Sequence, residues 1–274
     1  MGQRPLACFL SGLLCCVAAI VANAQTAATQ HARVELLARQ ESVKPGTDLM
    51  LGLHFVLEPG WHIYWVNPGD SGQPPSLKWT LPPGFSAGEI KWPRPERMQP
   101  SSQLVDYGYH GDVLLPVTLH ATSGVNSASA EIRADAKWLI CREVCIPEHA
   151  QLRLNLPATS GAAKASAPLF ATADKLLPQP LPRGWKATAK STRDGFVLTI
   201  VAGKPLAKAV FFPLDPDQIE NAAPQKVMPS STGAGIALKK SDLSSKPATV
   251  LRGVLSVPGG PAYRIEAPIR QSLQ

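Results

Sequence analysis

Short stretches of β-branched and aromatic residues, each ended by proline or glycine, run along most of the chain. The 27 Pro and 21 Gly among 274 residues supply turn signals at this spacing, and long helical periodicity is nearly absent. The stretch from Asp48 to Leu57 shows the pattern clearly, because apolar residues alternate at Leu49, Leu51, Leu53 and Phe55. The sequence therefore predicts a mainly β protein.

Seven or eight strand-like stretches precede residue 157, and their spacing is typical of a β-sandwich. A turn is expected from Asn67 to Gly72, where Pro, Gly, Asp and Ser follow one another. The principal expected strands are 33–39, 48–57, 61–66, 76–80, 113–120, 130–140 and 150–156.

A small, polar segment at 157–167 has no residue able to anchor a core, so it is expected to be a linker. It separates a first domain, 25–156, from a second domain, 168–274, also expected to be a β-sandwich. The second domain contains no Cys and no His, so its role is left open. It should hold a short helix at 169–177 and strands at 185–189, 196–201, 209–212, 235–238, 249–257 and 263–267.

Residues 1–24 are expected to be a secretory signal peptide. Arg4 supplies a positive start, residues 6–21 are apolar, and Ala22-Asn23-Ala24 offers small residues for cleavage. A retained anchor is the alternative, but the apolar run is shorter than the roughly 20 residues of a spanning helix. We therefore expect an exported, soluble chain with no membrane span after cleavage.

Signal cleavage changes the meaning of the cysteines. Of the 5 Cys, cleavage removes Cys8, Cys15 and Cys16 and leaves Cys141 and Cys145 in a compartment where disulfides persist. If the two strands around them pair as a hairpin, the cysteines lie near its tip. Facing Cα atoms there are about 4.5 to 5.5 Å apart, which a disulfide accepts.

Three roles for this pair stay open from spacing alone. A bridge closing so short a loop stabilises little, which favours redox exchange over a structural clip. Arg142 could stabilise a thiolate and Glu143 could oppose it. Cys141, Cys145 and His149 recur at intervals of four and could bind Cu(I) from one face of a helix, but Pro147 disfavours that helix.

The formal charge of +7 becomes +6 once Arg4 leaves with the signal peptide, because Arg4 is the one charged residue before Gln25. No basic run interleaves with aromatics, so we expect a solvated basic surface and no nucleic-acid partner.

Three ordered segments resemble a known family. Trp138-Leu-Ile-Cys-Arg-Glu-Val-Cys-Ile-Pro147 resembles the cysteine segment of the N-terminal periplasmic domain of the DsbD and ScsB thiol:disulfide interchange proteins. The segments Gly60-Trp-His-Ile-Tyr-Trp-Val-Asn-Pro-Gly-Asp-Ser-Gly72 and Asp106-Tyr-Gly-Tyr-His-Gly111, which leads into Val113-Leu-Leu-Pro116, agree with it. The resemblance covers about Val34 to Leu156.

The resemblance implies an immunoglobulin-like periplasmic domain with a catalytic Cys141–Cys145 disulfide and no cofactor. It also implies a cap loop that shields the cysteines. By position this is Asp106, Tyr107, Gly108 and Tyr109, with one of the two tyrosines as the shield. Ordinary packing of these tyrosines in a sheet is the alternative. Trp61, Tyr64 and Trp65 are assigned to core packing beneath the site.

The partners that the resemblance implies are a membrane-embedded thiol reductase as electron donor and oxidised periplasmic proteins as acceptors. The sequence carries neither the family's membrane electron carrier nor its thioredoxin-like domain. We therefore expect a free-standing thiol:disulfide oxidoreductase that serves disulfide correction or cytochrome c biogenesis. A copper-binding module and a non-catalytic interaction module with a structural disulfide are the alternatives.

Overall fold

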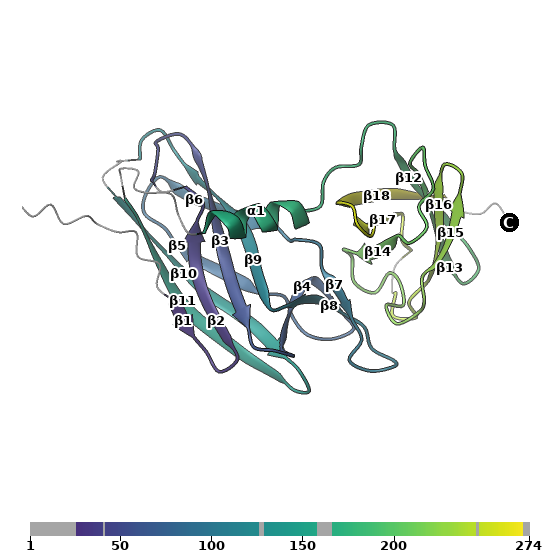
Figure 1. Cartoon of the computed structure of the whole chain (residues 1–274), viewed down its shortest axis with the longest axis horizontal. Helices are drawn as coiled ribbons and strands as arrows, with labels where there is room; N and C mark the ends of the chain where they lie inside the picture. The colour runs from purple at the N-terminus through teal and green to yellow at the C-terminus, as the bar shows by residue number, and fades with distance from the viewer. Residues whose placement is uncertain (1–25, 41, 126–128, 158–165, 245–246, 271–274) are drawn as a thin grey trace, which may run out of the picture.

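A computed structural model describes residues 26–40, 42–125, 129–157, 166–244 and 247–270. The expected signal peptide and most of the expected linker lie outside these residues. The described strands form an N-terminal sandwich of two sheets and a separate C-terminal sheet system, so the chain is mainly β with two sandwich domains, as predicted (Figure 1).

The first sheet of the N-terminal domain has the order β1-β2-β3-β9-β6, and its pairings are all antiparallel. Its strands are β1 (Thr26–Ala28), β2 (Ala32–Ala38), β3 (Asp48–Leu57), β6 (Phe85–Ile90) and β9 (Asp112–Ala121). The alternating Leu49, Leu51, Leu53 and Phe55 of β3 are all buried, which confirms the face predicted from the period of two.

The second sheet carries the cysteines. Its order is β11-β10-β4-β8-β7, and β5 pairs with β10 beside this path. Its strands are β4 (His62–Gly69), β5 (Ser76–Thr80), β7 (Glu96–Met98), β8 (Asp106–His110), β10 (Ser129–Cys141) and β11 (Cys145–Pro157). Every second residue of β10 from Ile132 to Ile140 packs into the core shared with the first sheet. This burial fixes the register of the hairpin and therefore the placement of its tip.

Helix α1 (Ala167–Leu176) confirms the predicted helix, although the sequence grouped it with the second domain. It packs on the N-terminal domain, where Phe170 and Ala173 contact Leu114 and where Arg39 donates a hydrogen bond of 2.6 Å to Asp174 (Figure 1). The chain therefore crosses to the C-terminal domain after this helix.

The C-terminal domain follows one path of paired strands, β14-β17-β18-β12-β13-β16-β15, in which β12 and β18 are parallel. Its strands are β12 (Lys186–Ser191), β13 (Gly195–Val201), β14 (Val210–Pro213), β15 (Lys226–Ser230), β16 (Gly233–Lys239), β17 (Val250–Ser256) and β18 (Ala262–Arg270). Leu198, Ile236, Leu251 and Leu255 are buried in its own core.

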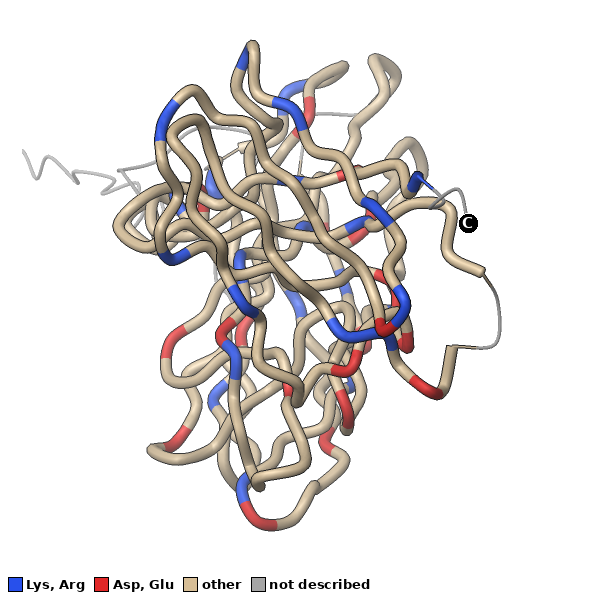
Figure 2. The backbone as a smooth tube through the Cα atoms, turned by 90° about the vertical axis from the view of Figure 1, so that its right-hand side faces the viewer, with Lys and Arg blue, Asp and Glu red and all other residues tan. Residues whose placement is uncertain are grey.

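The positive charge of the chain resides in the C-terminal domain. Residues 168–274 contain 14 Lys and Arg against 7 Asp and Glu, whereas residues 25–167 contain 12 against 13. Figure 2 shows both kinds of charge spread along the tube. The cysteine-bearing domain is therefore nearly neutral.

The strands predicted from the sequence are present, with ends that differ by a few residues. The sequence missed β1, β6, β7, β8 and β15, which are short or lie at sheet edges. Within the described ranges, no helix is long and apolar enough to cross a membrane.

Candidate functional site

The two cysteines end the long β10/β11 hairpin. Thirteen residue pairs join the strands in register, from Ser129 opposite Pro157 to Cys141 opposite Cys145. Residues 142–144 make the turn, in which the Arg142 N–H donates to the Val144 carbonyl at 3.2 Å. The Cα atoms of the cysteines lie 4.2 Å apart and their sulfurs are bonded. The predicted hairpin and the predicted Cys141–Cys145 disulfide are therefore both present.

The two ends of the disulfide differ in access. Cys141 is 2% exposed, whereas Cys145 is an exposed residue at the start of β11. Val144, just before it, is 63% exposed and leaves an apolar side chain at the tip. Cys145 is therefore the cysteine of the pair that lies at the protein surface, while Cys141 is covered by the fold.

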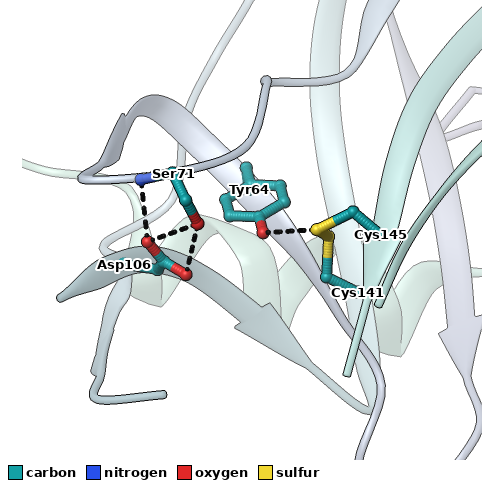
Figure 3. The surroundings of a disulfide bond; sticks show 5 residues. All are labelled: Tyr64, Ser71, Asp106, Cys141 and Cys145. Carbon is teal, nitrogen blue, oxygen red and sulfur yellow. Dashed lines mark hydrogen bonds between the residues drawn. A yellow bond between two sulfur atoms is a disulfide. The ribbon is translucent and has the colours of Figure 1, made fainter. Parts of the chain in front are cut away.

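Tyr64 is the aromatic residue in contact with the disulfide. It is 1% exposed, and its hydroxyl lies 3.5 Å from Cys145 Sγ (Figure 3). Burial raises the pKa of Tyr64, a hydrogen bond with Ser71 lowers it, and the charge of Asp106 raises it. Tyr64 therefore keeps its proton near neutral pH and can donate it in a hydrogen bond to the sulfur.

Asp106 and Ser71 form the next contact outward from Tyr64. The Ser71 N–H donates to Asp106 at 3.0 Å, and the Ser71 hydroxyl lies 2.9 Å from both carboxylate oxygens (Figure 3). Burial raises the pKa of Asp106, the two Ser71 bonds lower it, and the charge of Asp70 raises it. The carboxylate fixes the chain next to Tyr64.

His62 faces Cys141 across the sheet. The register places His62 opposite both Cys141 and His110, and its ring centroid is 5.2 Å from that of Tyr64. His62 is 7% exposed and its Nε2 has no hydrogen-bond partner. Burial, with a further effect from the His110 charge, lowers the pKa of His62 to about 4. The buried sulfur thus has a neutral imidazole as its neighbour.

The hairpin tip is braced by stacked rings. The Arg142 guanidinium lies 5.3 Å from the Trp61 ring centroid, and the His31 ring stacks on Trp61 with centroids 3.7 Å apart and planes 11° apart. Arg142 also lies 3.9 Å from the Glu143 carboxylate. Part of the charge of each tip residue is therefore balanced by the other.

The expected cap loop is corrected by the structure. Asp106, Tyr107, Gly108 and Tyr109 belong to strand β8, between β4 and β7, rather than to a loop. Alternation along β8 turns both tyrosine rings into the core, where they are 0% and 5% exposed. The Tyr107 hydroxyl donates to Asn221 and the Tyr109 hydroxyl to the Pro93 carbonyl. Burial raises the pKa of each tyrosine.

The assignment to core packing is confirmed for Trp61 and Trp65, which belong to the core of the N-terminal domain. Tyr64 is buried at 1% exposed, but it lies on the opposite face of β4, so the assignment to the core is wrong for this residue. Sequence reasoning missed that Tyr64 also touches the sulfur. The alternation of side chains along β4 could have indicated this contact. Ile63 and Trp65 face the core, so His62 and Tyr64 lie on the opposite face of the sheet, beside the cysteines.

The alternative metal set is not assembled. Cys141 and Cys145 are bonded to each other, and β11 is a strand, so His149 lies about 13 Å along it from Cys145. Among the described residues, no group of three or more His, Cys, Asp or Glu is placed to hold a metal ion. His149 instead lines a groove of about 320 Å³ with Gln73 and Pro147, beside the hairpin.

Accessible disulfides tend to be labile or catalytic rather than structural, and this one lies at the tip of a sandwich hairpin with Cys145 exposed and Cys141 buried. Residues 33–157 match the family described as "Thiol:disulfide interchange protein DsbD, N-terminal". This part of the chain is thus similar in sequence to the N-terminal domain of DsbD, as the resemblance implied.

A solved structure extends the likeness of fold to both domains. The crystal structure of the N-terminal periplasmic domain of ScsB from Proteus mirabilis matches with a TM-score of 0.68 and 18% sequence identity. The match covers 89% of this chain and 95% of that chain, so the C-terminal domain is part of the shared fold. No curated protein matches the sequence significantly.

Proposed function

We propose that this chain is a periplasmic thiol:disulfide oxidoreductase that relays electrons from a membrane-embedded thiol reductase to oxidised proteins through Cys141 and Cys145. The observation that carries the proposal is the unequal access to the two cysteines within a DsbD-type domain. An exposed cysteine can form a bond with a partner, and a buried one next to it can break that bond.

The weak entropic effect of the bridge supports exchange over a clip. A disulfide that closes a loop of five residues stabilises the folded protein by about 2 kcal/mol, whereas a bridge between distant strands stabilises it by more than about 4 kcal/mol. The hairpin is already joined by its full ladder of backbone pairs, so the disulfide adds little to its register. The role of the disulfide is therefore better explained by redox exchange than by stabilisation of the fold.

Loading with electrons begins when a thiolate of the donor attacks Cys145 Sγ. The Cys141–Cys145 bond breaks, Cys141 leaves as a thiolate that takes up a proton, and a donor–Cys145 disulfide forms. The second thiol of the donor loses its proton and attacks the donor sulfur of this mixed disulfide, which releases Cys145 as a thiolate. The donor becomes a disulfide, and two electrons now reside in the two cysteines.

Delivery is the same sequence in reverse. The Cys145 thiolate attacks the disulfide of an acceptor, one acceptor sulfur leaves as a thiol, and an acceptor–Cys145 disulfide forms. Cys141 then loses its proton and attacks Cys145 Sγ, so the internal disulfide returns and the acceptor leaves fully reduced. Tyr64 stabilises the Cys145 thiolate in both directions by donating its hydroxyl hydrogen bond.

Trapping tests this assignment. With Cys141→Ala, the exposed Cys145 should accumulate mixed disulfides with periplasmic proteins that a reducing agent releases. The matched variant Cys145→Ala should trap far fewer, because Cys141 is buried. If neither variant traps a protein in cells that express the candidate partners, the relay is refuted.

A further inference from the structure

We infer that the C-terminal domain positions the redox site, and that Asn221 is the positioning residue through which it acts. This inference rests on the proposed function and gives the second domain a part in it. The contact runs from Asn221 to the 69–72 turn (Gly69, Asp70, Ser71 and Gly72), from the turn to Tyr64, and from Tyr64 to Cys145.

The two domains share apolar packing next to the turn. Phe212 of β14 is buried in the N-terminal core, with its ring centroid 5.4 Å from Tyr107 and 6.4 Å from Trp65. A buried hydrogen bond of 2.9 Å joins the Asn67 side chain to the Pro213 carbonyl. Such a contact holds the C-terminal domain in one place against β4 and β8.

Asn221 is the polar centre of this contact. It is 8% exposed, its side-chain carbonyl accepts the Tyr107 hydroxyl at 3.0 Å, and its amide donates to Asp70 at 2.8 Å. Its backbone carbonyl accepts Arg97 at 3.0 Å. All of these partners belong to the N-terminal domain, so the side chain does not serve the fold of its own domain.

Asp70 links Asn221 to the backbone just before strand β8. Its second carboxylate oxygen accepts the Val105 N–H at 2.7 Å, and its own N–H donates to the Val105 carbonyl at 2.9 Å. The next residue, Ser71, holds Asp106 through its N–H and its hydroxyl. The turn is thereby fixed to the start of β8 at two successive residues.

The turn lies directly on the ring of Tyr64. Gly72 has φ +83°, and a Cβ atom at this position would be 2.1 Å from Tyr64 Cζ. The Tyr64 ring is therefore packed against bare backbone, and a shift of the turn must shift the ring. Its hydroxyl, which contacts Cys145 Sγ at 3.5 Å, would then lose its place.

The position of the Tyr64 hydroxyl should affect the thiol pKa of Cys145. A hydroxyl held toward the sulfur stabilises the thiolate and lowers the thiol pKa, so release of the turn should raise that pKa. The C-terminal domain would thus keep the attacking sulfur reactive without touching it.

The test uses the full mature chain, from Gln25, with Cys141→Ala, so that Cys145 is the only thiol. Its pKa is measured from the pH dependence of alkylation by iodoacetamide. Asn221→Ala should raise the pKa and lower the thiolate fraction at pH 7 by about three- to tenfold. Tyr64→Phe should do the same, and the two changes together should do no more than Tyr64→Phe alone.

Two controls separate positioning from general damage. Gln218→Ala removes another amide from the same segment, one that bonds Val250 in the C-terminal domain, and should leave the thiol pKa unchanged. In the exchanged pair, Asp70→Asn with Asn221→Asp, the amide and the carboxylate trade places. The amide at position 70 can then donate to the carboxylate at position 221, which still accepts the Tyr107 hydroxyl. The exchanged pair should restore the pKa that either single change disturbs.

The inference is overturned if folded Asn221→Ala keeps the parent thiol pKa, or if the effects of Asn221→Ala and Tyr64→Phe add. If Asn221→Ala does not fold, the exchanged pair and its single variants decide, and absence of rescue in the folded pair overturns the inference. Alkylation needs no partner protein, so this outcome is independent of the trapping experiment that tests the relay itself.

Discussion

His62 should make the stability of the oxidised protein depend on pH in a way that a single substitution removes. The folded protein holds the pKa of His62 at about 4, against about 6.5 for an ordinary histidine. Between these values the unfolded chain binds a proton that the folded chain does not. The free energy of unfolding should therefore fall as pH drops from about 6.5 to 4, and be flat with respect to His62 above pH 7.

The magnitude follows from the shift. From pH 7 to pH 5, linkage to the full shift gives about 2 kcal/mol. Solvent near the hairpin tip screens part of this charge, so the expected effect is about 1 kcal/mol. His110, Tyr64 and Cys141 face His62, and Glu96 pairs with His110 at 3.1 Å. Asp106, whose pKa is raised, acts in the opposite direction, but it is present in parent and variant alike.

Urea unfolding at pH 7, 6 and 5 measures this effect. His62→Gln should lose about 1 kcal/mol of the difference between pH 7 and pH 5. His120→Gln is the matched control, because His120 is exposed and pairs with Asp48 on the other sheet. An unchanged pH dependence in His62→Gln would refute the account of a buried neutral imidazole beside Cys141.

Three further predictions address the site and the interface. Tyr64→Phe should raise the thiol pKa of Cys145 by about one unit, because it removes the hydroxyl that contacts the sulfur. Tyr109→Phe is the control, since it removes a buried hydroxyl that bonds Pro93 instead, and it should leave this pKa unchanged. Equal shifts in both variants would contradict the contact between Tyr64 and Cys145. Gly72→Ala should lower the free energy of unfolding in urea by about 2 kcal/mol or more, because its φ is +83° and the added Cβ would overlap Tyr64. An unchanged free energy of unfolding would contradict the packing of Gly72 on Tyr64. Phe212→Ala should cost about 3 to 5 kcal/mol and increase proteolysis between the domains, and a loss below about 1 kcal/mol would show that the interface is weak.

The hairpin and its disulfide could be predicted because they depend on local pattern. Apolar alternation along β10 and β11 sets the register, and the register alone brings Cys141 opposite Cys145. No long-range information is needed for that result. The same reasoning succeeded for β3, where Leu49, Leu51, Leu53 and Phe55 are all buried, although Gly52 and His54 on the other face are buried as well.

Strand β8 could not be predicted in this way. Its sequence, Asp-Tyr-Gly-Tyr-His, contains a glycine and resembles a turn, but β4 and β7 pair with it on either side. A Cβ at Gly108 would lie 2.0 Å from the Ile63 carbonyl, so the glycine permits close approach of β4. Tertiary pairing thus overrides local propensity, and the tyrosines thought to form a cap face the core.

The partners of the disulfide are long-range and were missed for that reason. Ser71 and Asp106 are 35 residues apart, and Asn221 lies 151 residues from Asp70. Nothing in their local sequence marks these residues as neighbours. They meet because β4 and β8 are neighbours in one sheet and the C-terminal domain packs against both strands, which strand periodicity does not specify.

The reduction potential of the Cys141–Cys145 pair tests the central claim most directly. It can be measured by equilibrating the mature protein with glutathione or dithiothreitol buffers and quantifying the reduced fraction. A relay should have a potential between about −270 and −120 mV, the range of exchange-active pairs. A potential below about −300 mV, typical of structural disulfides, would contradict the relay and leave the pair as a clip.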